Sequence, residues 1–427
     1  MRSKVLLGLA CSATLALSAI AAYAGRKDTE LSRRFQQPIL KEERALHALN
    51  RLTFGPRPGD LETIQAVGLK KWMGRQLHPE QIAENPVLVE KLKRLDTLEM
   101  SSEELVRNYP TPQLVKQMVA GQIPFPADPE RRRMIRKLVA RAEKKQGDQP
   151  NPAVPDLAEL RQLLTAQQLR GGSPRQRLDT IQSLPADDRD AVIAALPPGM
   201  RLSLLPVAPP ELRRKIELTQ GPQQVVARDL AEGKLLRAIY SNRQLNEILV
   251  DFWFNHFNIY LEKGADRYLV TQYEREVIRP HVLGKFHDLL EATAKSPAML
   301  FYLDNWQSTG PDAPQPRAEA AKRARRGLNE NYGRELLELH TLGVDGGYTQ
   351  KDVTETARCF TGWTIAQPQR GGTFLFNPRL HDRGEKVVLG VKIPAGGGIE
   401  DGEKVLDILA HHASTAKFIS RELAQRF

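Results

Sequence analysis

The chain has 427 residues, of which 41% are hydrophobic and 26% charged, and this composition excludes fibrous and mainly disordered proteins. Its 62 Lys and Arg outnumber 51 Asp and Glu, which gives a formal charge of +11. Only two cysteines are present, Cys11 and Cys359, so a disulfide-stapled scaffold and a cysteine-based zinc finger are both excluded.

The first 24 residues have the pattern of a secretory signal peptide. Arg2 and Lys4 precede an uncharged apolar run from Val5 to Ala22, and the run ends in the AYA pattern that signal peptidase recognises. We predict cleavage after Ala24 and export to the periplasm or the extracellular space; an uncleaved membrane anchor is the alternative. Because no later apolar run is about 18 residues long, we expect no transmembrane span after the signal is removed.

Residues 25–109 are predicted to form an N-terminal helical part. Apolar residues recur at helical spacing along this segment, for example Ala45, Leu46, Leu49 and Leu52. The Phe-Gly-Pro sequence at 54–56 predicts the end of that helix.

Residues 110–222 differ in kind, because they hold more than half of the 29 prolines and a single aromatic residue, Phe125. We predict a peripheral, proline-rich helical insertion, since aromatic rings supply much of the buried area of a core. Its stretch from Glu130 to Lys145 is rich in Lys and Arg and has a narrow apolar stripe. This stretch predicts contact with an anionic envelope polymer or lipid surface, or else a solvated helix.

Residues 223–427 are predicted to form the helical core that carries the site. Aromatic residues concentrate between Tyr240 and Trp306, and helical patterns continue over about 331–342 and from Thr349 onward. An apolar stripe is still present at Phe427, which predicts that this part is C-terminally incomplete.

Two short β-like runs, at 373–376 and 386–389, flank a turn and predict one small β-hairpin. The fold class that follows is mostly α: a multi-helix globular core with that hairpin and a peripheral proline-rich helical insertion.

The first candidate site lies on the aromatic segment at 251–258. Asp251, Asn255 and Asn258 have i, i+4 and i+7 spacing and share one helical face, while His256 shares another face with Phe252. A helix this aromatic is expected to be buried together with its polar stripe. Both a structural hydrogen-bond network and a functional pocket remain open here.

A matching stripe follows on the helix at 331–342. Asn331, Glu335 and Glu338 again have i, i+4 and i+7 spacing. Arg334 can pair with Glu338, which is the structural interpretation. Two carboxylates on one face also suit acid–base or metal chemistry, because each raises the pKa of the other in a dry site.

The histidines offer a second chemistry. His256, His340 and His381, together with Asp382 and a Glu, could hold a divalent metal such as zinc or iron, although no HExxH motif is present and the cofactor stays unknown. His381 and Asp382 lie in the turn between the β-like runs, where a catalytic role and an exposed His beside an Asx turn are the two alternatives.

We expect the two polar stripes to meet in a shared interior site. His256 and His340 would flank this site, and the hairpin with His381 and Asp382 would cover its mouth. No phosphate-binding loop or dinucleotide fingerprint occurs, and with export we expect no nucleic-acid partner.

Several motifs resemble one family. They are DFWFNHFN at 251–258, LNENYGRELLELHTLGVDGGY at 328–348 and HDRGEK at 381–386, with HALNRLTFGP at 47–56 and LFYLDNW at 300–306. The sequence resembles the large bacterial family catalogued as domain of unknown function 1800. The resemblance implies an exported, mostly helical protein whose frequent genomic neighbour looks like the alkaline phosphatase and sulfatase group. It brings no established catalytic residues.

Two functions are compatible with these observations. The first is an exported hydrolase that acts on an envelope or extracellular polymer, and the second is a non-catalytic binding or scaffold partner of an exported phosphatase- or sulfatase-like protein. An open cleft with perturbed carboxylates would favour the first, and sealed carboxylates the second. The candidate catalytic residues are Glu335, Glu338, His340, His381 and Asp382, and the candidate binding residues are Asp251, Asn255, His256, Asn258, Asn331 and Arg334.

Overall fold

The computed structural model describes residues 38–129, 131–136, 139, 169–185, 188–189, 192–193, 196–314 and 327–427. The chain divides into two compact units between Met73 and Gly74. The predicted signal peptide and most of the basic stretch at 130–145 lie outside the described residues.

The first unit contains α2 (Arg44–Leu52), α3 (Asp60–Val67) and the start of α4 (Leu69–Gln76). Leu49 of α2 and Ile64 of α3 are each only 1% exposed and form the centre of this small unit. The predicted end of the first helix is confirmed. Gly55 follows it with a φ of 117°, a left-handed conformation that favours glycine.

The second unit begins with short helices whose N-termini are capped. Asn85, Ser101 and Thr111 each accept a hydrogen bond from a backbone N–H of the first turn that follows. The elements are η1 (Pro79–Gln81), α5 (Pro86–Leu92), η2 (Asp96–Leu98), α6 (Ser102–Asn108) and α7 (Pro112–Val119).

The described part of the predicted insertion contains helices that begin at prolines, where the missing N–H costs no helical hydrogen bond. They are α10 (Pro174–Ser183), α12 (Pro198–Leu204) and α13 (Pro210–Gln220), preceded by η3 (Leu169–Gly171). Ile181, Leu204 and Ile216 belong to an aliphatic cluster of their own. Leu114 and Met118 instead pack into a core cluster with Val226, so the start of the segment is not peripheral.

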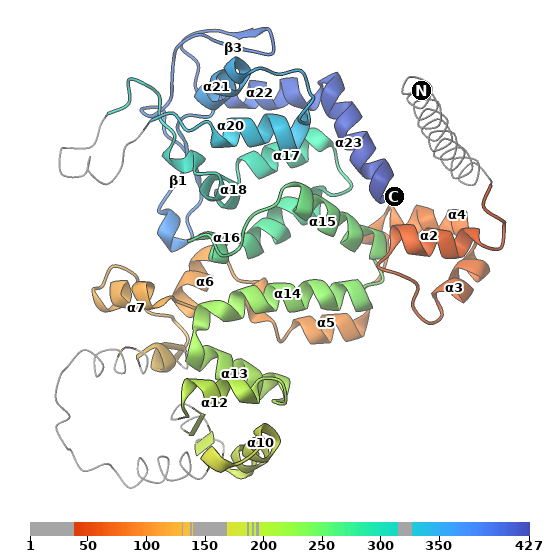
Figure 1. Cartoon of the computed structure of the whole chain (residues 1–427), viewed down its shortest axis with the longest axis vertical. Coiled ribbons are helices and arrows are strands. Elements are labelled where there is room, and N and C mark those ends of the chain that lie inside the picture. Colours follow the sequence, from red (N-terminus) through yellow and green to blue (C-terminus); the bar gives the residue numbers. More distant parts are fainter. Residues whose placement is uncertain are drawn as a thin grey trace, which may run out of the picture. The chain divides into compact units, whose positions relative to one another are not determined.

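The remaining helices form the main body, where α14 packs against α5, α15 and α16, and α22 packs against α17 and α21 (Figure 1). The packing of these helices buries most of the aromatic-rich segment, as predicted. The mostly-α fold class is also confirmed. The elements are α14 (Pro222–Tyr240), α15 (Gln244–His256), α16 (Asp266–Gln272), η4 (Tyr273–Ile278), η5 (Arg279–His281), α17 (Phe286–Ala294), α18 (Pro297–Tyr302), η6 (Asn305–Gln307), α20 (Asn331–Glu335), η7 (Leu336–Thr341), α21 (Gln350–Cys359), η8 (Pro368–Arg370), α22 (Glu400–Ala410) and α23 (Ala413–Arg426).

The β-structure consists of two separate antiparallel pairs rather than the single predicted hairpin. β1 (Trp363–Ile365) pairs with β2 (Phe374–Phe376), and β3 (Lys386–Val388) pairs with β4 (Val391–Ile393). Leu389 and Gly390 explain the difference, because their φ values of 49° and 78° suit the two-residue turn that joins β3 to β4. The predicted strands therefore exist, but each has another partner.

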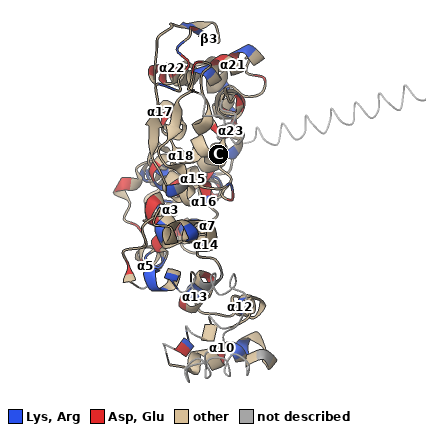
Figure 2. Cartoon of the chain, turned by 90° about the vertical axis from the view of Figure 1, so that its left-hand side faces the viewer, with Lys and Arg blue, Asp and Glu red and all other residues tan. Residues whose placement is uncertain are grey.

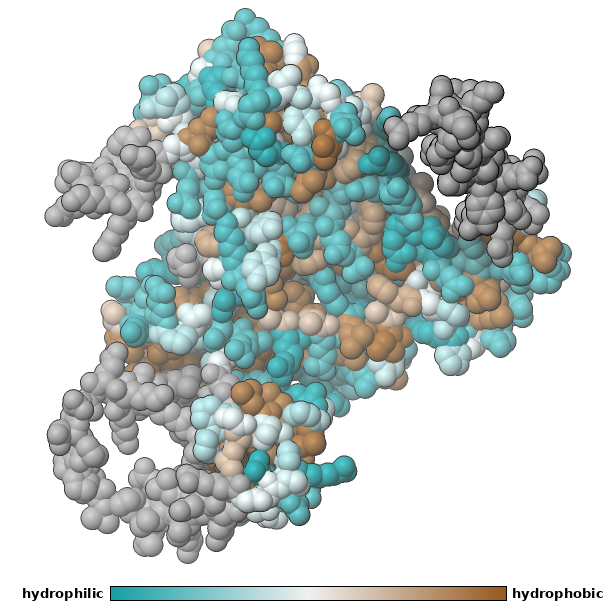
Figure 3. All heavy atoms as spheres, viewed as in Figure 1, coloured by the Kyte–Doolittle hydropathy of each residue, from teal (hydrophilic) through white to brown (hydrophobic). Residues whose placement is uncertain are grey.

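The surface is chemically mixed. Acidic and basic residues are interspersed along the elements in the view of Figure 2. Hydrophobic residues form small separate patches among polar ones on the face drawn in Figure 3. Within the described ranges, no helix has both the length and the apolar character needed to cross a membrane.

Candidate functional site

The C-terminal turn of α15 is held between two π-helices. On one side the Tyr273 hydroxyl of η4 donates to the Phe257 carbonyl oxygen at 2.9 Å. On the other side His256 Nε2 lies 3.1 Å from the carbonyl oxygen of His340 in η7. Single-turn π segments occur frequently at functional sites. The predicted aromatic segment is thus fixed on both sides.

An open pocket of about 480 Å³ lies beside this turn. α15 and α23 supply its lining: Asp251, Phe252, Asn255, His256, Glu422, Gln425 and Arg426. Three of the predicted binding residues, Asp251, Asn255 and His256, are therefore brought together. The α23 residues were missed, because Glu422 follows no motif and lies beside the apolar stripe of its helix.

His256 is the buried member of this pocket. Its side chain is 4% exposed, and Nδ1 lies 2.8 Å from Oε2 of Glu422, which is 29% exposed. The rings of Trp253 and Phe257 pack perpendicular to the imidazole, with ring centroids 5.5 and 4.6 Å away. His256 consequently joins α15, α23 and η7 through polar contacts in an aromatic surrounding.

His340 lies in the interior and not at the pocket wall. Burial, followed by the charge of neighbouring His256, lowers the pKa of His340 to about 3. The ring is therefore neutral and packs 5.1 Å from Phe257. The candidate catalytic role of His340 finds no support in this placement.

The two polar stripes do not meet across the core, and that prediction was wrong. Asn255, Asn258 and Asn331 are all exposed. The Asn255 amide donates to the Asp251 carbonyl oxygen of its own helix at 2.7 Å. The helices meet instead through His256 and His340, because turning the aromatic faces inward buries more apolar surface and leaves the amides hydrated.

Glu335 and Glu338 are half-buried. Burial raises the pKa of Glu335, and the charge of Glu338 adds to this effect while Arg334 opposes it. Glu338 accepts a hydrogen bond from the Tyr348 hydroxyl at 3.3 Å. Of the two carboxylates, it is therefore Glu335 that has the raised pKa which the sequence predicted.

Arg334 does not pair with Glu338 as expected. It donates to Gln350 Oε1 at 2.9 Å and lies 3.6 Å from the Glu330 carboxylate. The helix changes from α to π after Glu335, so Glu338 no longer lies one α-helical turn beyond Arg334.

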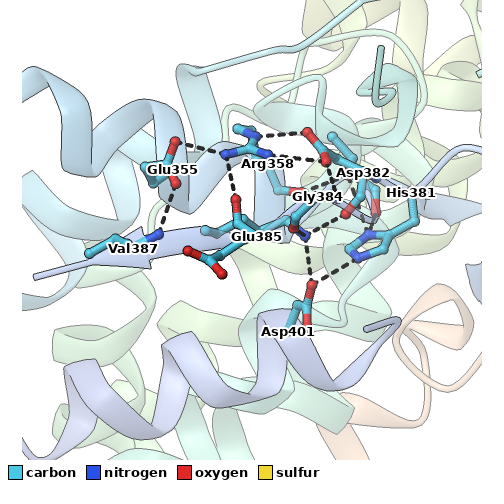
Figure 4. Close-up of polar contacts among 10 residues, drawn as sticks. Glu355, Arg358, His381, Asp382, Gly384, Glu385, Val387 and Asp401 are labelled. Atoms are coloured by element: carbon cyan, nitrogen blue, oxygen red, sulfur yellow. Dashed lines mark hydrogen bonds and ion pairs between the residues drawn. The ribbon is translucent and has the colours of Figure 1, made fainter. Parts of the chain in front are cut away.

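His381 and Asp382 are buried (Figure 4). The prediction that they lie on an exposed hairpin and cover the mouth of a site was therefore wrong. His381 Nδ1 lies 2.7 Å from the Thr361 carbonyl oxygen, and Nε2 lies 3.1 Å from Oδ2 of Asp401. Asp401 belongs to α22, so the ring links the turn to that helix.

The Asp382 carboxylate makes the expected Asx turn by accepting the Gly384 N–H at 2.8 Å. Burial tends to raise the pKa of Asp382, but hydrogen bonds from Arg358, at 2.7 and 3.2 Å, and Gly384 outweigh it, and the pKa is lowered. Lys386, fully buried, donates to the Asp382 and Gly384 carbonyl oxygens and to Asp401. These mutual contacts assign a structural role to the HDRGEK motif.

The predicted metal site is not assembled. Within the described residues, no three His, Cys, Asp or Glu side chains are grouped so that they could hold a metal ion. His256 and His340 have ring centroids 6.3 Å apart, but His381 belongs to the separate network with Thr361 and Asp401.

Fold and pocket together define a mainly α-helical protein with a partly acidic pocket at the end of an aromatic helix. The chain belongs to the family described as "Protein of unknown function (DUF1800)", whose model matches residues 47–427. The resemblance inferred from the motifs is thereby confirmed. No curated protein and no solved structure matches the chain.

Proposed function

We propose that this chain is an exported hydrolase that acts on an envelope or extracellular polymer bound in the α15–α23 pocket. The observation that carries the proposal is the convergence of two carboxylates, Asp251 and Glu422, with His256 in one open pocket. The sequence predicted Glu335 and Glu338 as the catalytic carboxylates, whereas this proposal assigns that role to Asp251 and Glu422 of the pocket lining.

The chemistry needs one group that protonates a leaving atom and one that activates water or stabilises developing charge. Glu422 faces His256 at 2.8 Å, so a proton can be shared between these two side chains. Asp251 lines the same pocket and supplies the second carboxylate. The amide of Asn255 and the guanidinium of Arg426 offer hydrogen bonds that would orient a substrate.

The test is a turnover screen of the purified chain against dye-labelled polysaccharides and peptidoglycan. We expect Glu422→Gln and Asp251→Asn to lose roughly a hundredfold or more of the activity, the usual scale for general acid–base groups. His411→Gln, which changes an exposed histidine away from the pocket lining, serves as the control. Equal turnover in all four proteins would reject the proposal.

A second candidate is a binding or scaffold partner of an exported phosphatase- or sulfatase-like protein. It is favoured by the sealing of His340, His381 and Asp382 inside the fold. Exposed aliphatic side chains on neighbouring helices, Leu235 of α14 and Val87 of α5, offer apolar contact area. Co-purification that Leu235→Asp abolishes while Glu422→Gln leaves it intact would support this candidate.

A further inference from the structure

We infer that His256 carries a proton on both ring nitrogens. The charges of the pocket lining then cancel, and the pocket binds an uncharged polyhydroxylated ligand. The place of the ligand rests on the proposed function, whereas the state of the ring rests on geometry alone.

The ring has an acceptor at each end. Nδ1 faces the Glu422 carboxylate at 2.8 Å, and Nε2 faces the His340 carbonyl oxygen at 3.1 Å. A carbonyl oxygen can only accept a hydrogen bond, and an ionised carboxylate likewise. A neutral imidazole has one N–H and would leave one of these contacts without a hydrogen. Only the doubly protonated ring donates to both.

The groups around the ring favour this state. Glu422 of α23 is the nearest charge, and Asp251 of α15 lines the same pocket. From η7 comes His340, which burial keeps neutral with a pKa of about 3. The positive group that lines the pocket with them is Arg426 of α23. The His256 side chain is only 4% exposed and packs perpendicular to the rings of Trp253 and Phe257, so water competes little for its N–H groups.

The charge of the lining follows from this protonation. Asp251 and Glu422 contribute two negative charges, and His256 and Arg426 contribute two positive charges. The other polar residues of the lining are the amides Asn255 and Gln425. An anionic ligand would approach two carboxylates, and a cationic one would approach Arg426 and the imidazolium. Hydroxyl groups, which both donate and accept, fit such mixed donors and acceptors without a charge penalty.

The first experiment determines the protonation state directly. We would label the full chain with ¹⁵N-histidine and record ring ¹H–¹⁵N correlation spectra at pH 7.5, assigning His256 by His256→Gln. We expect His256 to show two protonated ring nitrogens, while buried His340 in the same sample shows one. A single protonated nitrogen on His256 would overturn the inference.

The second experiment measures the ligand class by calorimetry at the same pH. Cellohexaose is the neutral probe, hexagalacturonate the anionic one and chitosan hexamer the cationic one. We expect the neutral hexamer to bind and the charged hexamers to bind roughly tenfold more weakly. Arg426→Gln removes one positive charge and should shift the preference toward the cationic hexamer.

The two proposals fail separately. Binding of a charged hexamer in preference to cellohexaose, or of none of the three, would overturn the ligand class. Binding of cellohexaose without turnover of any polymer would leave this inference standing and reject the hydrolase. His256→Gln distinguishes positioning from folding: the variant should melt as a folded protein but lose the binding that His411→Gln retains.

Discussion

Lys386 and Asp401 form an ion pair that is sealed from solvent, with Nζ and Oδ2 2.7 Å apart and side-chain exposures of 0% and 4%. The pair joins β3 to α22, two elements that are not adjacent in sequence. Because the ammonium group also donates to two backbone carbonyl oxygens, each of its three N–H groups has an acceptor. Removing either side chain would leave the charge of the other buried without a partner, which strongly destabilises a fold.

We therefore expect Lys386→Met to lower the free energy of unfolding by about 3–5 kcal/mol, since it leaves the Asp401 charge buried without its cation. The measurement is urea unfolding followed by tryptophan fluorescence. Lys392→Met in the same hairpin is the matched control, because Lys392 and Glu385 are 65% and 51% exposed. The control should change stability by less than about 1 kcal/mol. Equal effects of the two substitutions would contradict the assigned role.

Asp266 is expected to make stability depend on pH. It is fully buried, and neither carboxylate oxygen has a hydrogen-bond partner within the described chain. Burial raises its pKa to about 8, against the opposing charge of Lys263 and with a further increase from Asp304. The folded state therefore holds a proton that the unfolded state releases near pH 4.

It follows that the Asp266 contribution to stability is fully present below about pH 4 and is lost as pH rises toward 8. Asp266→Asn should melt at a higher temperature than the parent at pH 8 and differ little at pH 4. The control is Asp312→Asn, at an exposed position. A melting curve for Asp266→Asn that follows the parent at both pH values would show that the buried acid has a partner.

Glu335 gives a test that separates structure from function. Its raised pKa, caused by burial and by Glu338, means that its ionised form is disfavoured in the fold. We expect Glu335→Gln to raise the melting temperature at pH 7, on the order of 1 °C, and the gain to vanish near pH 3. Exposed Glu232→Gln is the control. A clear loss of stability in Glu335→Gln would instead assign the carboxylate a structural partner.

Gly402 packs closely against the ring of a buried tryptophan. A Cβ atom at this position would lie 2.6 Å from Cζ2 of Trp363, which is itself fully buried. Gly402→Ala should lower the free energy of unfolding, measured with urea, by about 1–3 kcal/mol, because the added methyl group would overpack the surrounding core. Gly74→Ala in α4, where nothing lies within 4 Å, should be neutral or stabilising by up to about 1 kcal/mol. A stabilising Gly402→Ala would show that Trp363 can move.

Local features were predictable from sequence. The helix predicted from Thr349 onward is present, and Thr349 and Asp352 form a capping box in which both reciprocal hydrogen bonds are made. The mostly-α class followed from helical periodicity, and the family from long motifs. Each of these signals depends on residues within about four positions of one another, which is the range that backbone geometry controls.

The predicted polar stripes show what local spacing cannot predict. Helical spacing correctly grouped Asp251 with Asn255, but it could not say which face of α15 turns inward. That choice depended on η7 and α23, which cover His256 and the aromatic rings from distant parts of the chain. The loop position of His381 likewise predicted exposure, yet α22 supplies Asp401 and encloses it.

Short-range backbone and side-chain preferences were enough to predict the mostly helical character, the start of the helix after Thr349, the segments of β2 and β3, and the family, but not β1 or β4. The strand partners, the enclosure of Lys386 and the pocket lined by Asp251, His256 and Glu422 depend instead on contacts between distant parts of the chain. Long-range pairing has no signature in local spacing. It is set by which packing of the whole core buries the most apolar surface while every enclosed charge keeps a partner.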